Sequence, residues 1–264
     1  MSQISDPNPA SLPLYLAYQP VVNITHTEPH VAAYECLLRV GPNTQGQTHN
    51  SVLEAAERNG SIENLDLWIA EKAAYDASLN PEMRIWLNLS QTTLSSAPSI
   101  RQITQLFYAR AVSSQMRIEM TETLNGCERR IIENLKWLKR MSIGVVIDDI
   151  HEGYSKAHLL QTDLVSGCKL SRNSTVQLAC SQKHFDDTAR MVDWCKDNEK
   201  TVVMEGIETE SEMDIALRLG VDFCQGFYFW PALELTNLPL FGESVAIPKS
   251  SSQRLLYVPD RAAE

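Results

Sequence analysis

The feature of this sequence that most constrains its fold is a repeated alternation of short apolar segments with helical patterns. Helical spacing of apolar residues predicts helices over residues 51–60, 62–80, 128–141 and 211–220, and the first and last of these end at a glycine. Eight apolar or β-branched segments of strand length lie near residues 15–18, 31–38, 84–89, 117–120, 143–147, 164–170, 201–204 and 221–224. This alternation is typical of a parallel α/β sheet, and 264 residues suit a single TIM-like (β/α)8 barrel. A doubly wound open sheet is the alternative, but the chain has neither a G-x-G-x-x-G motif nor a phosphate-binding P-loop.

Composition excludes several classes of protein. No apolar run approaches the ~18 residues of a membrane span, and the first residues, MSQISDPNPASLP, lack the basic and apolar regions of a secretory signal. Six scattered cysteines without a C-x-x-C pair are typical of reduced thiols in a cytoplasmic protein. The formal net charge of −10, with no block of Lys or Arg, argues against binding to nucleic-acid polymers or anionic membranes. A small anionic ligand stays compatible with this charge if metal ions neutralise the site.

The expected domain organisation is simple, because no low-complexity linker splits the chain. We expect a barrel domain over residues 14–247, an N-terminal extension over 1–13 and a poorly ordered tail over 248–264.

Polar side chains stand near the C-terminal end of almost every predicted strand. In a barrel these ends converge on one face, which is where active sites of this fold lie. One such residue would usually be a helix cap, a turn residue or a solvated surface group. The whole set is difficult to explain in that way, since several members lie inside apolar runs with no turn signal beside them. The set comprises Gln19, Glu35, Asn88, Glu119, Glu122, Asp148, Asp149, Lys169, Glu205, Glu208 and Gln225.

The chemistry of this set predicts a site for two metal ions. The amide oxygen of Asn88 joins five carboxylates, and no His or Cys occupies these positions. Ligands that are all oxygen favour Mg²⁺, Mn²⁺ or Ca²⁺ over structural zinc. Five carboxylates beside one lysine, Lys169, leave a surplus of negative charge that suits two divalent ions, the usual arrangement for in-line displacement at phosphorus. The five carboxylates are Glu35, Glu119, Asp148, Asp149 and Glu205.

An ordered series of short motifs over roughly residues 14–235 resembles the EAL-domain phosphodiesterases, bacterial enzymes that hydrolyse the signalling dinucleotide cyclic di-GMP. The motifs are, in order, YQPVV, YECLLR, LNLS, EMTET, IDDIHEGYS, CKLSR, EGIETE and CQGFYFWPAL. The resemblance implies a TIM-like barrel with one antiparallel strand and a homodimer. It also implies that two Mg²⁺ or Mn²⁺ ions activate water to open cyclic di-GMP to linear pGpG.

The resemblance implies a role for each site residue. Lys169 and Glu205 would position or deprotonate the attacking water, Glu208 would support them, and Glu122 would brace the loop after Asp149. The implied metal ligands are Glu35, Asn88, Glu119, Asp148, Asp149 and Glu205. The implied substrate contacts are Gln19, Leu37, Arg39 and Gln225, with Arg39 at a phosphate.

Three positions depart from the family pattern. Cys36 replaces the alanine of the Glu-Ala-Leu signature, and Ser171 replaces the aspartate of the Lys-Ile-Asp segment. Ile150-His151-Glu152 replace Phe-Gly-Thr in the loop after the aspartates, and we expect this change to weaken catalysis without removing it. The alternative function is a catalytically silent module that binds cyclic di-GMP or a protein partner. A third hypothesis is a different metal-dependent barrel enzyme that uses Lys169 for proton abstraction.

Overall fold

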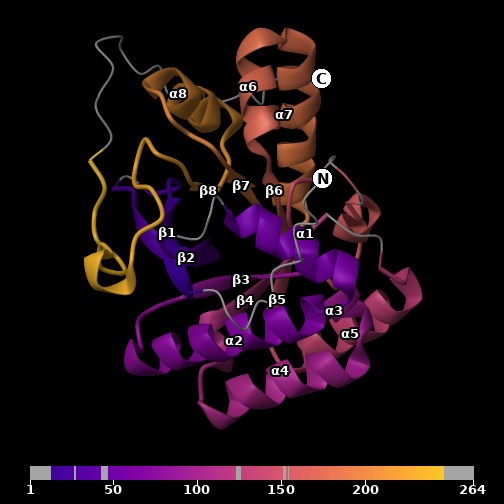
Figure 1. Cartoon of the computed structure of the whole chain (residues 1–264). Helices are drawn as coiled ribbons and strands as arrows, with labels where there is room; N and C mark the ends of the chain where they lie inside the picture. Colours follow the sequence, from indigo (N-terminus) through magenta and orange to yellow (C-terminus); the bar gives the residue numbers. More distant parts are fainter. Residues whose placement is uncertain are drawn as a thin grey trace, which may run out of the picture.

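The computed structural model describes residues 13–26, 28–42, 47–122, 126–150, 153 and 155–246. Eight strands close into a barrel in sequence order, and each overlaps one of the eight predicted apolar segments (Figure 1). The strands are β1 (Leu14–Asn23), β2 (His30–Val40), β3 (Ile85–Leu89), β4 (Met116–Met120), β5 (Gly144–Ile147), β6 (Gly167–Leu170), β7 (Thr201–Met204) and β8 (Phe223–Cys224). Residues 1–12 of the predicted extension and the whole predicted tail, residues 248–264, lie outside the described residues.

Strand direction confirms the predicted TIM-like barrel with one antiparallel strand. β1 runs antiparallel to both of its neighbours, β2 and β8, and every other neighbouring pair is parallel. The β1–β2 ladder places Gln19 opposite Glu35, and the β3–β4 ladder places Asn88 opposite Glu119. The register therefore brings four predicted site residues to one end of the barrel.

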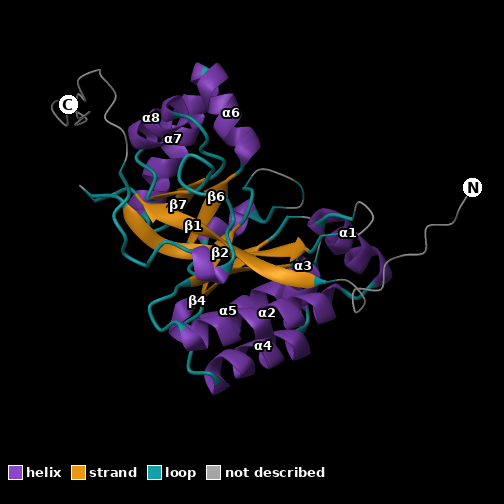
Figure 2. Cartoon of the chain, turned by 60° about the vertical axis from the view of Figure 1, so that its left-hand side comes forward, coloured by secondary structure: helices purple, strands orange, loops and turns teal. Residues whose placement is uncertain are grey.

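Helices surround the barrel in two groups (Figures 1 and 2). Helices α2, α4 and α5 lie together on one side of the sheet, and α6, α7 and α8 lie together on the other. The helices are α1 (His49–Asn59), α2 (Ile62–Leu79), α3 (Gln91–Ser95), α4 (Ala97–Ala109), α5 (Glu128–Arg140), α6 (Arg172–Cys180), α7 (Gln182–Asp197) and α8 (Glu210–Leu219). Short 3-10 turns cover Ser113–Gln115, Ala157–Gln161 and Leu235–Asn237. None of these helices combines the length and hydropathy that crossing a bilayer requires, within the part of the chain that the structure describes.

The ends of the predicted helices follow their local sequence. Thr48 and Thr209 begin α1 and α8 with capping boxes, in which side chain and backbone satisfy each other's free donors. Gly60 and Gly220 end the same helices with φ of 76° and 67°, a left-handed conformation that glycine adopts without a steric cost. These four residues fix where α1 and α8 start and stop.

A small apolar cluster forms the floor of the site. It contains Val21, Ala33, Trp86 and Val203, with Phe223 packed edge-on against Trp86. Side chains two positions apart along a strand share a face of the sheet. Each of these five residues stands two positions from a predicted site residue, namely Gln19, Glu35, Asn88, Glu205 and Gln225 respectively. The same alternation therefore places an apolar layer beneath the polar one.

Candidate functional site

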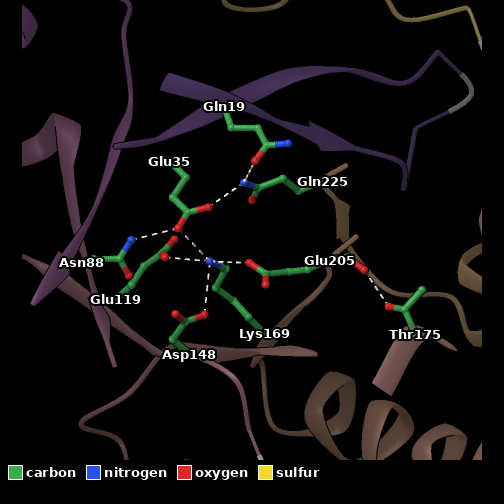
Figure 3. A network of polar contacts seen from close by, with 9 residues as sticks. All are labelled: Gln19, Glu35, Asn88, Glu119, Asp148, Lys169, Thr175, Glu205 and Gln225. Carbon is green, nitrogen blue, oxygen red and sulfur yellow. Dashed lines mark hydrogen bonds and ion pairs between the residues drawn. The ribbon is translucent and has the colours of Figure 1, made fainter. Parts of the chain in front are cut away.

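The ammonium of Lys169 lies at the centre of the site, surrounded by four carboxylates. Lys169 Nζ is 2.5 Å from Glu205 Oε1, 2.7 Å from Glu119 Oε2, 3.2 Å from Asp148 Oδ1 and 3.5 Å from Glu35 Oε1. Figure 3 shows these side chains converging; they come from β2, β4 and β6 and from the residues that directly follow β5 and β7. The side chain of Lys169 is 1% exposed, so water contributes little to the solvation of its charge. The four carboxylates together with Lys169 Nζ are called the lysine cluster below.

Three amide side chains orient Glu35 within this arrangement. Asn88 Nδ2 donates to Glu35 Oε1 at 2.8 Å, and Gln225 Nε2 donates to Glu35 Oε2 at 2.5 Å. Gln225 Nε2 also donates to Gln19 Oε1 at 3.0 Å, and Gln19 Nε2 donates to the Trp230 carbonyl at 3.1 Å. Both oxygens of Glu35 thus have amide donors, which fixes the direction of the carboxylate (Figure 3).

Burial and the surrounding charges shift the pKa of each carboxylate in the lysine cluster. Burial raises the pKa of Glu119 and of Asp148 above their usual values, with neighbouring carboxylates adding to the rise and Lys169 opposing it. Burial and the charges of Asp148 and Glu35 raise the pKa of Glu205 to about 8. At Glu35 burial acts in the same direction, but Lys169 and the amide donors outweigh it and the pKa is lowered. The pKa of Lys169 lies well above its usual value, since the four carboxylates outweigh the effect of burial.

The residues present fit a divalent cation. Buried oxygens of Asn88 (Oδ1), Glu119 (Oε1) and Asp148 (Oδ1) have no hydrogen-bond donor among the described residues. Asp148 Oδ1 does lie within ion-pair distance of Lys169 Nζ. All three atoms are acceptors, and a buried acceptor without a donor or ion-pair partner, as at Asn88 and Glu119, is costly unless a cation or water satisfies it. Oxygen-only donors of this kind match Mg²⁺, Mn²⁺ or Ca²⁺.

A second acidic group adjoins the lysine cluster. Carboxylate oxygens of Glu122, Asp148 and Asp149 lie within 4.8 Å of one another, close enough to share one metal ion. Asp149 adopts a left-handed backbone conformation with φ of 42°, which non-glycine residues adopt infrequently. Asp148 belongs to both groups and so connects them. Glu122, which the resemblance placed at the loop, is a candidate metal ligand in this geometry.

Glu122 also limits the loop after the aspartates. Gly153 has φ of 49°, and a β-carbon added there would lie 2.8 Å from both Cγ and the backbone oxygen of Glu122. Only glycine fits at position 153, because the loop passes so close to Glu122. The predicted role of Glu122 in bracing this loop requires such a close approach. Ile150 is 2% exposed and its N–H donates to the Lys169 carbonyl at 3.0 Å. His151 and Glu152, the residues that depart from the family pattern, lie outside the described residues.

A pocket of about 500 Å³ opens beside the two acidic groups. Asn88, Asp148 and Asp149 line one part of it, and Leu37 and Arg39 line another. Arg39 Nη1 donates to the Leu38 carbonyl at 2.9 Å, which holds the guanidinium along this wall. The pocket therefore combines a cationic side chain, which suits an anionic ligand, with an edge of carboxylates that fits a divalent cation.

Glu208 lies apart from the lysine cluster. It is exposed, and its carboxylate oxygen Oε2 lies 3.0 Å from Nη2 of Arg172, the first residue of α6. Its supporting role toward Lys169 and Glu205 stays a prediction. The other predicted site residues lie in the lysine cluster, in its amide contacts, in the second acidic group or along the pocket wall.

Sequence reasoning missed two residues that hold the site. Asp66 is 3% exposed, and its Oδ2 accepts from Ser90 N, Ser90 Oγ and Thr93 Oγ1, which fixes the chain just after Asn88. The sequence feature that could have identified Asp66 is its position on the apolar face of the helix predicted over 62–80. Thr175 Oγ1 donates to the Glu205 carbonyl at 2.6 Å, and no sequence pattern announces that contact.

Comparison with known proteins agrees with this geometry. The EAL domain family model matches residues 11–232. Cyclic di-GMP phosphodiesterase NbdA of Pseudomonas aeruginosa is 26% identical, and the match covers 86% of this chain and 30% of that protein. Biofilm architecture maintenance protein MbaA of Vibrio cholerae is 26% identical, with 84% of this chain and 29% of that protein covered. This chain thus spans about 30% of the length of either relative.

A solved structure supports the same assignment. The PaMucR phosphodiesterase in complex with c-di-GMP superimposes with a TM-score of 0.73 at 25% identity, covering 83% of this chain and 92% of that one. The family match extends over most of the chain, and the eight-stranded barrel with one antiparallel strand agrees with it. This chain belongs to the EAL domain family.

Proposed function

We propose that this protein hydrolyses cyclic di-GMP to linear pGpG with the help of two divalent metal ions, Mg²⁺ or Mn²⁺. The observation that carries the proposal is the set of buried acceptor oxygens on Asn88, Glu119 and Asp148 beside the pocket that Arg39 lines. Buried acceptor oxygens of this kind are stabilised by a bound cation, and the pocket beside them suits an anionic ligand. Relatives named as cyclic di-GMP phosphodiesterases identify the dinucleotide as the substrate to test.

The metal ions would be held by two sets of ligands that share Asp148. Glu35, Asn88, Glu119 and Glu205 would join it on one side, and Asp149 with Glu122 on the other. When bound, two divalent ions neutralise the phosphodiester and lower the pKa of water at the reacting phosphorus.

Glu205 is the residue best suited to take the proton of the attacking water. Its side chain is 20% exposed, the largest fraction among the four carboxylates, so it is the one most accessible to water. Lys169 Nζ holds Glu205 Oε1 at 2.5 Å and so fixes the carboxylate toward the site. Gln19 and Leu37 would contact the dinucleotide, and Arg39 would bind a phosphate through charged hydrogen bonds.

The test is turnover by the purified protein. Cyclic di-GMP is incubated with Mg²⁺, with Mn²⁺ or with EDTA, and pGpG is measured by chromatography. We expect pGpG with either ion and none in EDTA. Glu119→Gln should abolish turnover, whereas the exposed Lys183→Gln on α7 is the matched control and should not change it.

Two outcomes would contradict the proposal in different ways. Binding of cyclic di-GMP without any turnover in the presence of metal would identify the silent binding module instead. Full turnover in EDTA would exclude the two-metal mechanism. The expected homodimer is a separate prediction, which light scattering coupled to size exclusion would test at the same time.

A further inference from the structure

Arg172 lies across the loop that carries Glu205. Its Nη1 donates to the Gly206 carbonyl and to Glu212 Oε1, and its Nη2 lies 3.0 Å from Glu208 Oε2. Gly206 has φ of 65°, and a β-carbon added there would lie 2.1 Å from Arg172 Cδ. The loop therefore has a glycine where the arginine side chain crosses it.

The carboxylate of Glu212 extends this contact to the next residues of the loop. Its Oε1 accepts from Arg172 Nη1 at 2.5 Å, and its Oε2 accepts from the backbone N–H groups of Glu208 at 2.8 Å and Thr209 at 2.9 Å. Burial would raise the pKa of Glu212, but these donors and Arg172 lower it, so the group is ionised at neutral pH. Arg172, in α6, and Glu212, in α8, together hold residues 206–209.

Glu205 is held at its backbone by the same part of the fold. Its N–H donates to the Leu170 carbonyl at 3.0 Å, and its carbonyl accepts from Thr175 Oγ1 at 2.6 Å. The next residue but one, Ile207, donates its N–H to the Gln225 carbonyl at 3.0 Å. Leu170, Arg172 and Thr175 all lie within six residues of Lys169, so one short segment positions both Lys169 and Glu205.

A fixed loop is needed because the charges around Glu205 oppose one another. Three further carboxylates of the lysine cluster repel it, and Lys169 is the cation of that cluster that attracts it, at 2.5 Å. Its side chain is 20% exposed, the largest fraction among the four carboxylates, so an outward turn into solvent is open to it. Contacts that hold the loop backbone remove the freedom that such a turn requires.

We propose that Arg172 is a positioning residue that fixes the 205–209 loop and so keeps the Glu205 carboxylate at Lys169 and the metal site. Glu208 contributes to the same positioning by pairing with the Arg172 guanidinium. The part of this inference that concerns catalysis rests on the proposed function. The part that concerns the loop and the metal site does not need turnover.

The experiment compares Arg172→Ala with the conservative Arg172→Lys. Arg190→Ala is the matched control, because Arg190 is an exposed arginine on α7 that pairs with Asp187. Three quantities are measured for each protein: hydrogen exchange of the 205–209 amides, affinity for Mn²⁺ alone by calorimetry, and kcat with KM for cyclic di-GMP. Loss of a residue that orients a metal ligand typically costs about 10- to 100-fold in affinity or activity.

For Arg172→Ala we expect at least about tenfold faster exchange at Glu208 and Thr209, whose amides bond to Glu212. We expect kcat and Mn²⁺ affinity to fall by about 10-fold or more, with KM changed by less than about threefold. Arg172→Lys should show smaller losses than Arg172→Ala, since lysine keeps the positive charge but lacks the planar set of N–H donors of the guanidinium. Arg190→Ala should match the wild type throughout.

Other results would overturn the positioning role of Arg172 or the proposed function, as follows. A wild-type kcat in Arg172→Ala overturns the proposal, whatever the exchange shows. So does a loss of protection spread over the whole barrel, which would make Arg172 a general structural residue. If the wild type turns over no cyclic di-GMP, the proposed function fails and Mn²⁺ affinity takes the place of kcat in the same comparison. If Arg172→Ala does not fold, Arg172→Lys decides by the same measurements.

Discussion

Replacing Lys169 with methionine removes the one cation of the lysine cluster while keeping a side chain of similar length. In the wild type Nζ lies between 2.5 and 3.5 Å from four carboxylates, and the Lys169 side chain is 1% exposed. Removing one partner of a buried ion pair costs about 3–5 kcal/mol, because the remaining charge has neither water nor a counter-ion. Without metal, we therefore expect Lys169→Met to be less stable than the wild type by roughly that amount.

A divalent cation should reverse most of this loss. The four carboxylates of the variant have no competing ammonium, so they should bind Mn²⁺ more tightly than those of the wild type. Mn²⁺ stabilises both proteins, so only the difference in their affinities changes the gap between them. If the variant binds the ion about 100-fold more tightly, it gains about 2.7 kcal/mol relative to the wild type. The deficit of about 3–5 kcal/mol in EDTA should then shrink to about 0.3–2.3 kcal/mol in saturating Mn²⁺. Turnover should still fall at least ~100-fold, since the ammonium no longer fixes Glu205.

The assay is urea unfolding followed by circular dichroism, in EDTA and in Mn²⁺, for the wild type and Lys169→Met. Lys183→Met, an exposed lysine on α7, is the control and should not differ from the wild type in either condition. Equal stability of wild type and Lys169→Met in EDTA would refute the reasoning about charge in the cluster. A deficit that Mn²⁺ leaves unchanged would refute the overlap between the ammonium and the metal site.

Four further predictions follow from the site. Arg39→Ala should weaken cyclic di-GMP binding by about 1.5–3 kcal/mol with a smaller effect on kcat, as calorimetry and kinetics would show; intact affinity would contradict the phosphate contact. Ca²⁺ should inhibit turnover supported by Mg²⁺, because its longer, looser coordination misplaces the reacting groups; equal rates with Ca²⁺ alone would oppose this. Burial raises the pKa of Asp66 from 3.8 to about 6, so its proton is held more tightly in the folded state. The stability of the wild type should therefore fall by about 2.4 kcal/mol relative to Asp66→Asn as pH rises from 4 to 7, measured by denaturant unfolding, and a constant difference would refute it. The double change His151→Gly, Glu152→Thr should raise kcat/KM, with a smaller gain at high salt if the Glu152 charge is the main handicap; an unchanged or lower kcat/KM would show that the loop is not a handicap.

Local sequence was sufficient for the strands and for the donor chemistry of the site. Short strands can be recognised from their apolar runs. Side chains alternate between the two faces along a strand, so Glu35 shares a face with Ala33, and Asn88 with Trp86, whichever strand pairs beside them. The capped helices α1 and α8 were predictable for the same reason, since Thr48, Gly60, Thr209 and Gly220 act on neighbouring residues. The sequence patterns did not predict helices α3, α4, α6 and α7.

Tertiary structure alone decided which charged groups share an environment. Lys169 and Glu35 are 134 positions apart in sequence, and only closure of the barrel brings their side chains within 3.5 Å. The same closure gives neighbouring residues different contacts. Asp148 lies 3.2 Å from Lys169 Nζ, whereas Asp149 joins Asp148 and Glu122 in the second acidic group. Glu205 lies at Lys169, whereas Glu208 reaches Arg172. Residue type and spacing are properties of the chain itself, but burial and the distances between charges exist only once the fold has removed water, and these set the pKa values on which the chemistry depends.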